Sequence, residues 1–301
     1  MNRWKDWAAF WLLGLIWGSS FLWIRIAVQE IGPFMLVALR VLIGALGLAL
    51  VAAVARPALP RTARTYVAMA VLGLINTALP FVLISWGETR IPSSLASILN
   101  GTVPLFTILI AHFALHDDRI TLPRVLGLAV GFAGVVVLLS KDFEPGTIHA
   151  SLLGQGAVIL AAVSYAGASV YARTQIRNLA PLVSAMLPLI AADLFMWLAL
   201  PVFESPVRFP VLPITWVALF WLGLLGSCVA YLLYFHLIRQ WGPTRSTMVT
   251  YVFPVVGLLL GILFLDEHAD WRFMAGSALI VAGIGVVNWR PRRAAVQPAA
   301  K

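Results

Sequence analysis

The sequence predicts an all-α polytopic membrane protein with ten transmembrane helices, arranged as two inverted five-helix repeats. Three observations carry this prediction. The 301 residues are 61% hydrophobic and only 11% charged, about half the charged fraction of a soluble domain. The apolar residues occur in blocks of about 18–25, the length of a helix that crosses a bilayer. The second half of the chain also repeats a pattern found in the first.

Ten apolar blocks follow one another with short connections, so the chain forms one membrane-embedded unit. Five of the blocks begin at a proline, which fits the first turn of a helix. The first block has no small-residue cleavage pattern, so it is a retained span and not a signal peptide. The only cysteine, Cys228, lies inside a span, which excludes a disulfide framework. The predicted spans are 7–29, 33–54, 65–87, 92–115, 123–140, 151–175, 181–203, 213–237, 244–265 and 271–289.

An internal repeat relates residues 72–118 to residues 222–268, 150 positions later. Few residues are identical, but the apolar spans and the prolines keep step: Pro104 corresponds to Pro254. The first spans of the two halves also correspond, at an offset of 148. Prolines that keep step favour a true repeat over a chance likeness of two apolar hairpins.

The repeat divides the chain into residues 1–145, residues 146–290 and a tail of residues 291–301, predicted to be disordered and cytoplasmic. Each half has five spans, an odd number, so the second half enters the membrane from the opposite side. The halves are then related by a pseudo-two-fold axis in the membrane plane. Inverted repeats of this kind place a binding site near the midplane and work by alternating access.

The basic residues predict the orientation. If the N-terminus is cytoplasmic, fifteen Lys and Arg lie on its side, five lie on the other side, and Arg40 lies inside a span, which accounts for all 21. The positive-inside rule then places both termini in the cytoplasm, for a multi-pass protein of the cytoplasmic (inner or plasma) membrane. The net charge of +9 does not indicate nucleic-acid binding, because the basic residues are spread over short loops.

Several short motifs resemble those of EamA-type members of the drug/metabolite transporter superfamily, and together they cover residues 7 to 289. They are Leu15-Ile16-Trp17-Gly18-Ser19-Ser20-Phe21 with Arg25, Gly32-Pro33 with Leu39-Arg40, Pro92-Ser93-Ser94-Leu95-Ala96-Ser97 with Pro104, and Leu265-Asp266-Glu267 with Gly276 and Gly283. The sequence departs from the family at His116-Asp117-Asp118, where the family usually has Gly-Glu. The resemblance implies a ten-helix carrier, often an exporter of amino acids or related metabolites. It also implies a central cavity lined by helices 1–4 and 6–9, with helices 5 and 10 at the periphery.

Prolines inside spans predict helix kinks at Pro80, Pro104 and Pro254. Each removes a backbone hydrogen bond and leaves the carbonyl group four residues earlier without its usual donor. In a bilayer such a carbonyl needs a partner in protein or in a wet cavity. The three carbonyls belong to polar residues, Asn76, Asn100 and Thr250, so we expect these residues to line a cavity. The alternative is that each side chain repairs its own helix or bonds a neighbouring residue.

Aromatic residues in the middle of spans are the second set of candidates, since membrane-interface aromatics lie near span ends. Trp17 and Tyr165 occupy equivalent positions in the two halves, and Tyr231, Tyr234 and Tyr251 are also central. They are expected to form an amphipathic wall, with ordinary packing as the alternative. The complete set of predicted substrate-binding residues is Trp17, Ser20, Asn76, Asn100, Tyr165, Tyr231, Tyr234, Thr250 and Tyr251.

Charge inside the spans is scarce. Asp193 lies midway along the seventh span, where a carboxylate is a functional candidate because it costs about 3 kcal/mol to insert. Three interpretations stay open: an ion pair of Asp193 with Arg40 or Arg25, proton coupling through Asp193, and contact of Arg40 with a substrate carboxylate. His112 and His236 are isolated, so no metal site and no cofactor are expected.

The predicted function is that of a secondary transporter that moves small metabolites by alternating access and most often exports amino acids. Uptake or exchange of a sugar or another small metabolite is the alternative, and a channel or a membrane scaffold is a weaker one. An enzyme is not expected, because no nucleophile–base or metal constellation is present. The expected partners are a neutral or zwitterionic solute and the lipid bilayer. Nucleic-acid binding is not expected. Glycine-rich faces on the fifth and tenth spans fit either packing within the chain or a homodimer.

Overall fold

The computed structural model describes residues 3–114, 121–140, 143–144, 147–148, 150–175, 179–241, 249–250, 252–268 and 270–288. Within these residues the regular secondary structure is helical apart from one short hairpin. Eight helices, some of them built from two segments, are long and apolar enough to cross a membrane. Two shorter apolar helices, Val252–Leu265 and Trp271–Val286, lie where the ninth and tenth spans are predicted. The predicted tail, residues 291–301, lies outside the described residues.

The first half of the chain forms a run of helices. In order they are α1 (Arg3–Ala27), α2 (Pro33–Ala55), α3 (Ala63–Gly73), the π-helical segment η1 (Leu74–Ala78), α4 (Leu79–Glu88), α5 (Ser93–Asn100), α6 (Val103–Ala114) and α7 (Leu122–Leu139).

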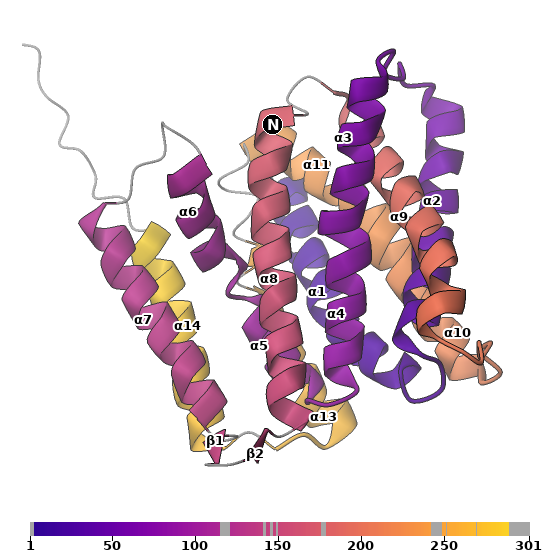
Figure 1. Cartoon of the computed structure of the whole chain (residues 1–301). Helices are drawn as coiled ribbons and strands as arrows, with labels where there is room; N and C mark the ends of the chain where they lie inside the picture. The colour runs from indigo at the N-terminus through magenta and orange to yellow at the C-terminus, as the bar shows by residue number, and fades with distance from the viewer. Residues whose placement is uncertain are drawn as a thin grey trace, which may run out of the picture.

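The second half opens with a small hairpin of β1 (Phe143–Glu144) and β2 (Thr147–Ile148), in which Phe143 pairs with Ile148. Its helices are α8 (Ala150–Gln175), α9 (Pro181–Phe203), α10 (Pro213–Phe220), the π-helical segment η3 (Trp221–Val229), α11 (Ala230–Trp241), α13 (Val252–Leu265) and α14 (Trp271–Asn288). The end of the bundle that carries the hairpin is at the bottom of Figure 1, and we call it the hairpin end.

Two of the prolines predicted to kink helices coincide with irregular backbone. The α-helix of the third span changes to the π-helical segment η1 directly before Pro80. The fourth span is broken at residues 101–102, between α5 and α6, directly before Pro104. Pro254 lies in the first turn of α13, and the start of the predicted ninth span falls outside the described residues. The segment η3 contains no proline, so no prolyl ring marked it in the sequence.

Helices α7 and α14 pack side by side at one edge of the bundle (Figure 1). Glycines allow the close approach: a Cβ atom on Gly134 would lie 2.6 Å from the carbonyl oxygen of Gly276. On Gly283, a Cβ atom would lie 2.5 Å from the backbone nitrogen of Gly131. The small-residue faces predicted on these two spans are therefore used within the chain, while the homodimer stays a prediction.

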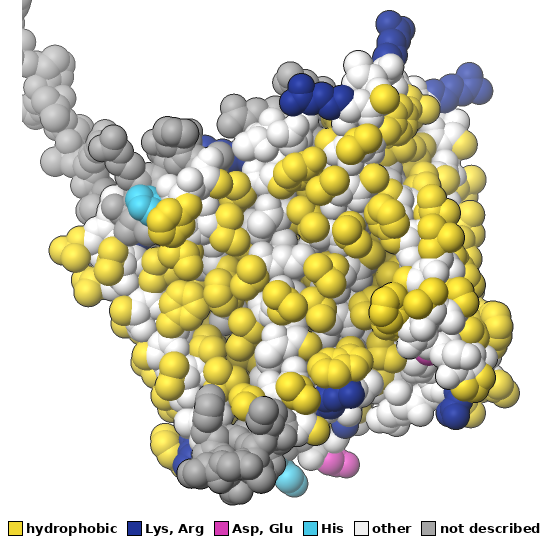
Figure 2. All heavy atoms as spheres, in the orientation of Figure 1, with side chains coloured by type: hydrophobic (Ala, Val, Ile, Leu, Met, Phe, Trp, Pro, Cys, Tyr) yellow, Lys and Arg dark blue, Asp and Glu magenta, His cyan; other side chains and the backbone are white. Residues whose placement is uncertain are grey.

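The face shown in Figure 2 is apolar across the middle of the bundle, and the Lys and Arg side chains visible on it lie toward the two ends. Large hydrophobic residues point outward on several helices, among them Leu50, Phe113 and Leu263. A soluble monomer rarely exposes contiguous apolar surface of this extent. Together with the long apolar helices, this surface identifies a multi-pass membrane protein.

Candidate functional site

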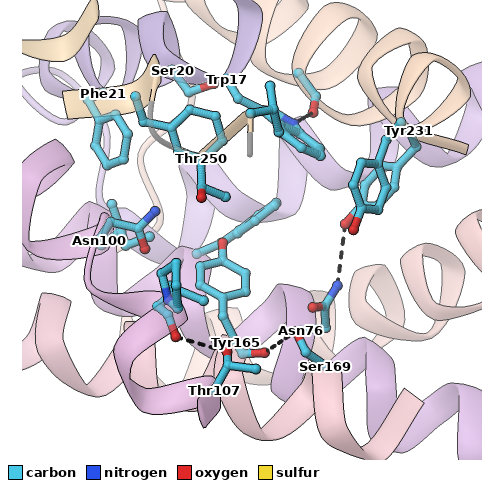
Figure 3. A pocket seen from close by; sticks show the side chains of 18 of the residues that line it. Trp17, Ser20, Phe21, Asn76, Asn100, Thr107, Tyr165, Ser169, Tyr231 and Thr250 are labelled. Carbon is cyan, nitrogen blue, oxygen red and sulfur yellow. Dashed lines mark hydrogen bonds between the residues drawn. The ribbon is translucent and has the colours of Figure 1, made fainter. Parts of the chain in front are cut away.

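A cavity of about 380 Å³ lies inside the bundle, between helices of both halves of the chain (Figure 3). Most of its lining is apolar or aromatic, with a few polar groups among the rings. The lining residues are Trp17, Ser20, Phe21, Ile24, Arg40, Asn76, Phe81, Ile84, Asn100, Val103, Pro104, Thr107, Ile108, Tyr165, Ser169, Gly226, Tyr231, Tyr234, Val249, Thr250 and Phe253.

The structure brings together eight of the nine residues predicted to bind substrate. They are Trp17, Ser20, Asn76, Asn100, Tyr165, Tyr231, Tyr234 and Thr250. The ninth, Tyr251, lies outside the described residues. Apolar lining residues such as Phe81, Ile84 and Phe253 were missed, because their sequence context does not differ from that of core residues. Substrate binding by the eight residues remains a prediction.

Trp17 is the centre of an aromatic cluster on one wall of the cavity. Its ring centroid lies 5.5 Å from that of Tyr234, 5.8 Å from that of Phe253 and 6.2 Å from that of Tyr231. The indole N–H donates a hydrogen bond of 3.0 Å to the carbonyl oxygen of Gly226. Gly226 lies in the π-helical segment η3, so irregular backbone of the second half fixes an aromatic side chain of the first.

The polar lining residues differ in how far their hydrogen bonds are satisfied. The amide of Asn76 donates to the hydroxyl oxygen of Tyr231 over 3.4 Å, so it contacts the other half of the chain (Figure 3). The hydroxyl of Ser20 donates to the carbonyl oxygen of Ile16 in its own helix. The side-chain oxygen of Asn100 is buried and has no hydrogen-bond partner. A buried amide oxygen without a donor costs about 1–3 kcal/mol.

Arg40 lies in the cavity wall and is 4% exposed. Its guanidinium group lies over the ring of Phe81, with Cζ 3.9 Å from the ring centroid, and its Nε has no hydrogen-bond partner. Among the residues that line the cavity in the described part of the chain, Arg40 is the only charged one.

The ion pair expected between Asp193 and Arg40 or Arg25 is absent from the described residues, and Asp193 is not part of the cavity wall. Asp193 is partly exposed on α9, and its Oδ1 has no hydrogen-bond partner. The neighbouring Leu189 and Ala192 are buried in the bundle. At about 100° per residue, Asp193 lies only about 40° around the helix from Leu189 and about 100° from Ala192, so it lies between the buried and the exposed faces of α9 and is partly exposed. The structure does not test proton coupling through Asp193.

The hairpin end of the bundle carries three carboxylates that sequence reasoning did not assign. Glu267 accepts hydrogen bonds from the backbone N–H of Ser93 (2.7 Å), the hydroxyl of Ser93 (3.0 Å) and the backbone N–H of Ser94 (2.9 Å). These N–H groups open α5, where a helix has no internal acceptors for them. Glu267 was singled out only within the family motif Leu265-Asp266-Glu267. The glutamate belongs to the second half of the chain and the helix start to the first.

Glu204 and Glu30 make similar contacts between the halves. Glu204, at the end of α9, accepts from the backbone N–H groups of Phe34 (2.8 Å) and Met35 (3.4 Å), at the start of α2. Glu30, in the turn after α1, accepts from the backbone N–H of Val211 (2.6 Å) and from that of the next residue (2.8 Å), just before α10. The nearby Thr215 hydroxyl and these two N–H groups hold the pKa of Glu30 below its ordinary value. A negative charge at a helix N-terminus is stabilised by the helix dipole.

Glu88, the last residue of α4, is also at the hairpin end, and it differs from the other three. Its side chain is fully buried, and neither carboxylate oxygen has a hydrogen-bond partner. Its backbone carbonyl oxygen accepts a hydrogen bond from Arg25. The charged side chains that interact with the carboxylate are Glu267, Arg25 and Arg40. Sequence reasoning missed Glu88 because it ended the third span at residue 87.

His236, one of the two isolated histidines, contacts Asp6 over 3.0 Å. Within the described residues, no group of three or more His, Cys, Asp or Glu side chains is placed to hold a metal ion.

Known proteins of similar sequence are named as transporters. The chain is 28% identical to a probable terminal-alkyne amino-acid exporter of Streptantibioticus cattleyicolor, over 94% of each sequence. It is 26% identical to a probable amino-acid metabolite efflux pump of Escherichia coli, over 96% of this chain and 98% of that protein. The uncharacterized transporter YoaV of Bacillus subtilis is 24% identical over 90% of this chain and 92% of its own length.

One solved crystal structure shares the fold, with a TM-score of 0.67 and 24% sequence identity over 95% of this chain and 98% of that one. The sequence model of the EamA-like transporter family matches the chain twice, at residues 6–140 and again at residues 152–289. The two matches fall on the two halves inferred from the repeat. The chain belongs to the EamA-like transporter family.

Proposed function

We propose that the protein is a secondary transporter that exports amino acids across the cytoplasmic membrane by alternating access, with both termini in the cytoplasm. The observation that carries this proposal is the make-up of the cavity wall. Residues at equivalent positions of the two halves line one cavity, as expected of a carrier whose binding site lies between inverted repeats.

Seven pairs of lining residues support the two inverted five-helix repeats. Each pair joins one residue of the first half to the residue 148 or 150 positions later. At an offset of 148 they are Trp17 with Tyr165 and Phe21 with Ser169. At an offset of 150 they are Asn76 with Gly226, Phe81 with Tyr231, Ile84 with Tyr234, Asn100 with Thr250, and Val103 with Phe253. The π-helical segments η1 and η3 also overlap at the offset of 150.

Contacts between the halves at the hairpin end support alternating access. In the proposed orientation this end faces the outside. Three carboxylates join the helices of one half to those of the other there, from Glu30, Glu204 and Glu267. Buried Ile24 and Ile84 lie between these contacts and the cavity centre on α1 and α4. Release of a solute to the outside would require these contacts to separate.

An amino acid with an apolar side chain suits the cavity. Its volume of about 380 Å³ falls in the range of small-molecule sites, which are mostly apolar with a few placed polar groups. The Trp17 cluster supplies the apolar surface, and Arg40, Asn76 and Asn100 supply the polar groups. Two relatives are named as an amino-acid exporter and an amino-acid metabolite efflux pump, which favours the same class.

The test is transport by the purified protein in liposomes loaded with a mixed amino-acid pool, with and without a pH gradient. We expect saturable efflux of at least one apolar amino acid, accelerated by the same amino acid on the other side. Trp17→Ala should lower this efflux about tenfold, as expected when a residue that contacts substrate loses roughly 1.4 kcal/mol of interaction.

The matched control is Trp11→Ala on the same helix, since Trp11 is 54% exposed on the outer surface of the bundle. This variant should transport at the wild-type rate. Robust sugar flux without amino-acid flux would contradict the substrate class. A conductance that never saturates would contradict the carrier mechanism.

A further inference from the structure

We propose that the guanidinium group of Arg40 binds a carboxylate of the transported solute, so the substrates are small molecules with a free carboxylate group. The inference rests on the proposed function, because it assigns a chemical class to the solute in the same cavity. It is carried by a buried cation that faces a cavity and lacks a hydrogen-bonded anion of its own.

Arg40 lies where a free charge is costly. It is the eighth residue of α2, after Met35, Leu36, Val37 and Ala38, whose side chains are fully buried. An arginine near the centre of a membrane helix costs several kcal/mol unless it has a partner or reaches water. Arginines inside membrane spans are therefore rare, and a functional role is the default hypothesis for them.

The protein supplies little compensation for this charge. The Nε atom of Arg40 has no hydrogen-bond partner, and no carboxylate oxygen lies within 4.0 Å of the guanidinium group among the described residues. The ring of Phe81, 3.9 Å from Cζ, provides a cation–π contact of about 2 kcal/mol, but a ring face does not neutralise the charge or replace a hydrogen-bonded carboxylate. Glu88 is the anionic group that acts on Arg40 from a distance, but both its oxygens lack hydrogen bonds as well. A strong acceptor at Arg40 is missing.

Space for that acceptor lies beside the guanidinium. A Cβ atom on Gly226 would lie 3.8 Å from Nη2 of Arg40, and glycine places no side chain there. The equivalent residue of the first half is Asn76. The side chain present at that position of the first half is therefore absent at Gly226, which leaves more room in the cavity on this side. A carboxylate in this space would accept two parallel N–H bonds, the geometry in which arginine binds carboxylates most strongly.

The rest of the wall suits the opposite end of a zwitterion. The rings of Trp17, Tyr234 and Phe253 lie together, and aromatic faces attract ammonium groups. The side-chain oxygen of Asn100, which lines the same cavity (Figure 3), has no hydrogen-bond partner and is an acceptor for an ammonium N–H. A solute with one carboxylate and one ammonium group therefore satisfies both Arg40 and Asn100, whose unpaired atoms lie in the described part of the cavity wall.

The experiment measures binding to the purified protein by competition and does not depend on transport. L-leucine, L-leucinamide and 4-methylpentanoate share one apolar chain, but the amide lacks the carboxylate and the acid lacks the ammonium group. We expect the wild type to bind leucine at least tenfold more tightly than leucinamide. In Arg40→Gln the ratio of the Kd for leucinamide to the Kd for leucine should fall to about one. In Arg40→Lys this ratio should lie between the two values. The control Arg90→Gln, at an exposed arginine stacked on Trp86, should keep the wild-type preference.

The outcomes separate the inference from the proposed function. Unchanged preference in Arg40→Gln, with intact leucine transport, would overturn the inference alone. Binding of 4-methylpentanoate that depends on Arg40, without binding of any amino acid, would overturn amino-acid export alone. No binding of any carboxylate compound would overturn both.

Two further measurements cover a structural role of Arg40. If Arg40 serves only as counter-charge to Glu88, the double variant Arg40→Gln, Glu88→Gln should recover the preference for leucine, which would overturn the inference. If the Arg40 variants do not fold, the wild type can be labelled with phenylglyoxal, which modifies arginine. Leucine should then protect Arg40 severalfold better than leucinamide, and equal protection would overturn the inference.

Discussion

Two sets of buried polar groups in this molecule differ in how far their hydrogen bonds are satisfied: the helix starts at the hairpin end and the cavity wall. At the hairpin end, Glu204 and Glu267 each hold backbone N–H groups at the start of a helix from the other half. In the cavity, Arg40 and Asn100 keep atoms that have no hydrogen-bond partner. Folded proteins pair nearly all buried polar groups, so an exception in a cavity indicates a partner from outside the chain.

A single helix contains both situations. The first turn of α2 has its N–H groups at Phe34 and Met35 bonded to Glu204. Arg40, about two turns further along, has an unpaired Nε. The difference is therefore local and does not reflect a poorly packed helix, since the residues between the two sites are fully buried. The start of α2 is thus held by a contact between the two halves of the chain, whereas the cavity-lining part of the same helix carries an atom without a partner.

The largest effect on stability is expected from Glu267→Ala. Ser93 and Ser94 are 1% and 3% exposed, so the two backbone N–H groups and the Ser93 hydroxyl would be left without an acceptor. Loss of such a cap and the burial of unpaired donors cost about 2–4 kcal/mol in total. Thermal unfolding of the purified protein in detergent would show a clear fall in melting temperature. The variant Glu267→Gln retains one carbonyl acceptor, so its melting temperature should fall less. If Glu267→Ala melted at the same temperature as the wild type, Glu267 would not be a stabilising contact between the halves.

The polar and several of the aromatic residues of the cavity wall were predictable from sequence because two independent signals point to them. Prolines four residues after polar residues selected Asn76 and Asn100, and the equivalence of mid-span aromatics selected Trp17 and Tyr165. Both signals depend on local spacing or on the repeat, and neither requires knowledge of contacts between helices. The bilayer length rule also found the helices, since eight of them are long and apolar enough to cross a membrane.

The features that sequence reasoning missed depend on which helix faces meet. The bond from Glu267 to Ser93 joins residues 174 positions apart, and no local pattern gives such a pairing. The ion pair of Asp193 with Arg40 or Arg25, one of the three open interpretations, is not formed among the described residues; the sequence placed these residues by depth in the membrane only. Depth follows from counting residues, but the direction of a side chain depends on the packing of α9 and α2. The segment η3 was missed because no proline marks it.

A smaller effect, with a defined pH dependence, is expected from Glu30→Gln. The pKa of Glu30 lies below its ordinary value of 4.5, because the Thr215 hydroxyl and the N–H groups of Val211 and Leu212 favour the charged form. Since the folded-state pKa is the lower one, this contribution to stability is complete above the unfolded-state pKa and disappears as the pH falls through the folded-state pKa.

The measurement is the difference in melting temperature between the wild type and Glu30→Gln, from pH 7 down to pH 3. The wild type should have the higher melting temperature. The difference should stay constant down to about pH 5 and shrink below about pH 4, in the range where the carboxylate becomes protonated. The exposed position of these hydrogen bonds keeps the effect small. A difference that grows on acidification would have the wrong sign for a carboxylate that caps a helix.

The variant Asn100→Leu is expected to have the smallest effect on stability but a large effect on transport. In Asn100→Leu, a buried amide whose oxygen has no partner is replaced by an apolar group of similar size. Such replacements are nearly neutral or stabilising, because no hydrogen bond is lost and a desolvation cost is removed. The melting temperature should therefore stay within a few degrees of the wild type, while leucine efflux from liposomes falls severalfold. If Asn100→Leu were strongly destabilised, its amide would be structural like the groups at the hairpin end, and the contrast between the two regions would not hold at this residue.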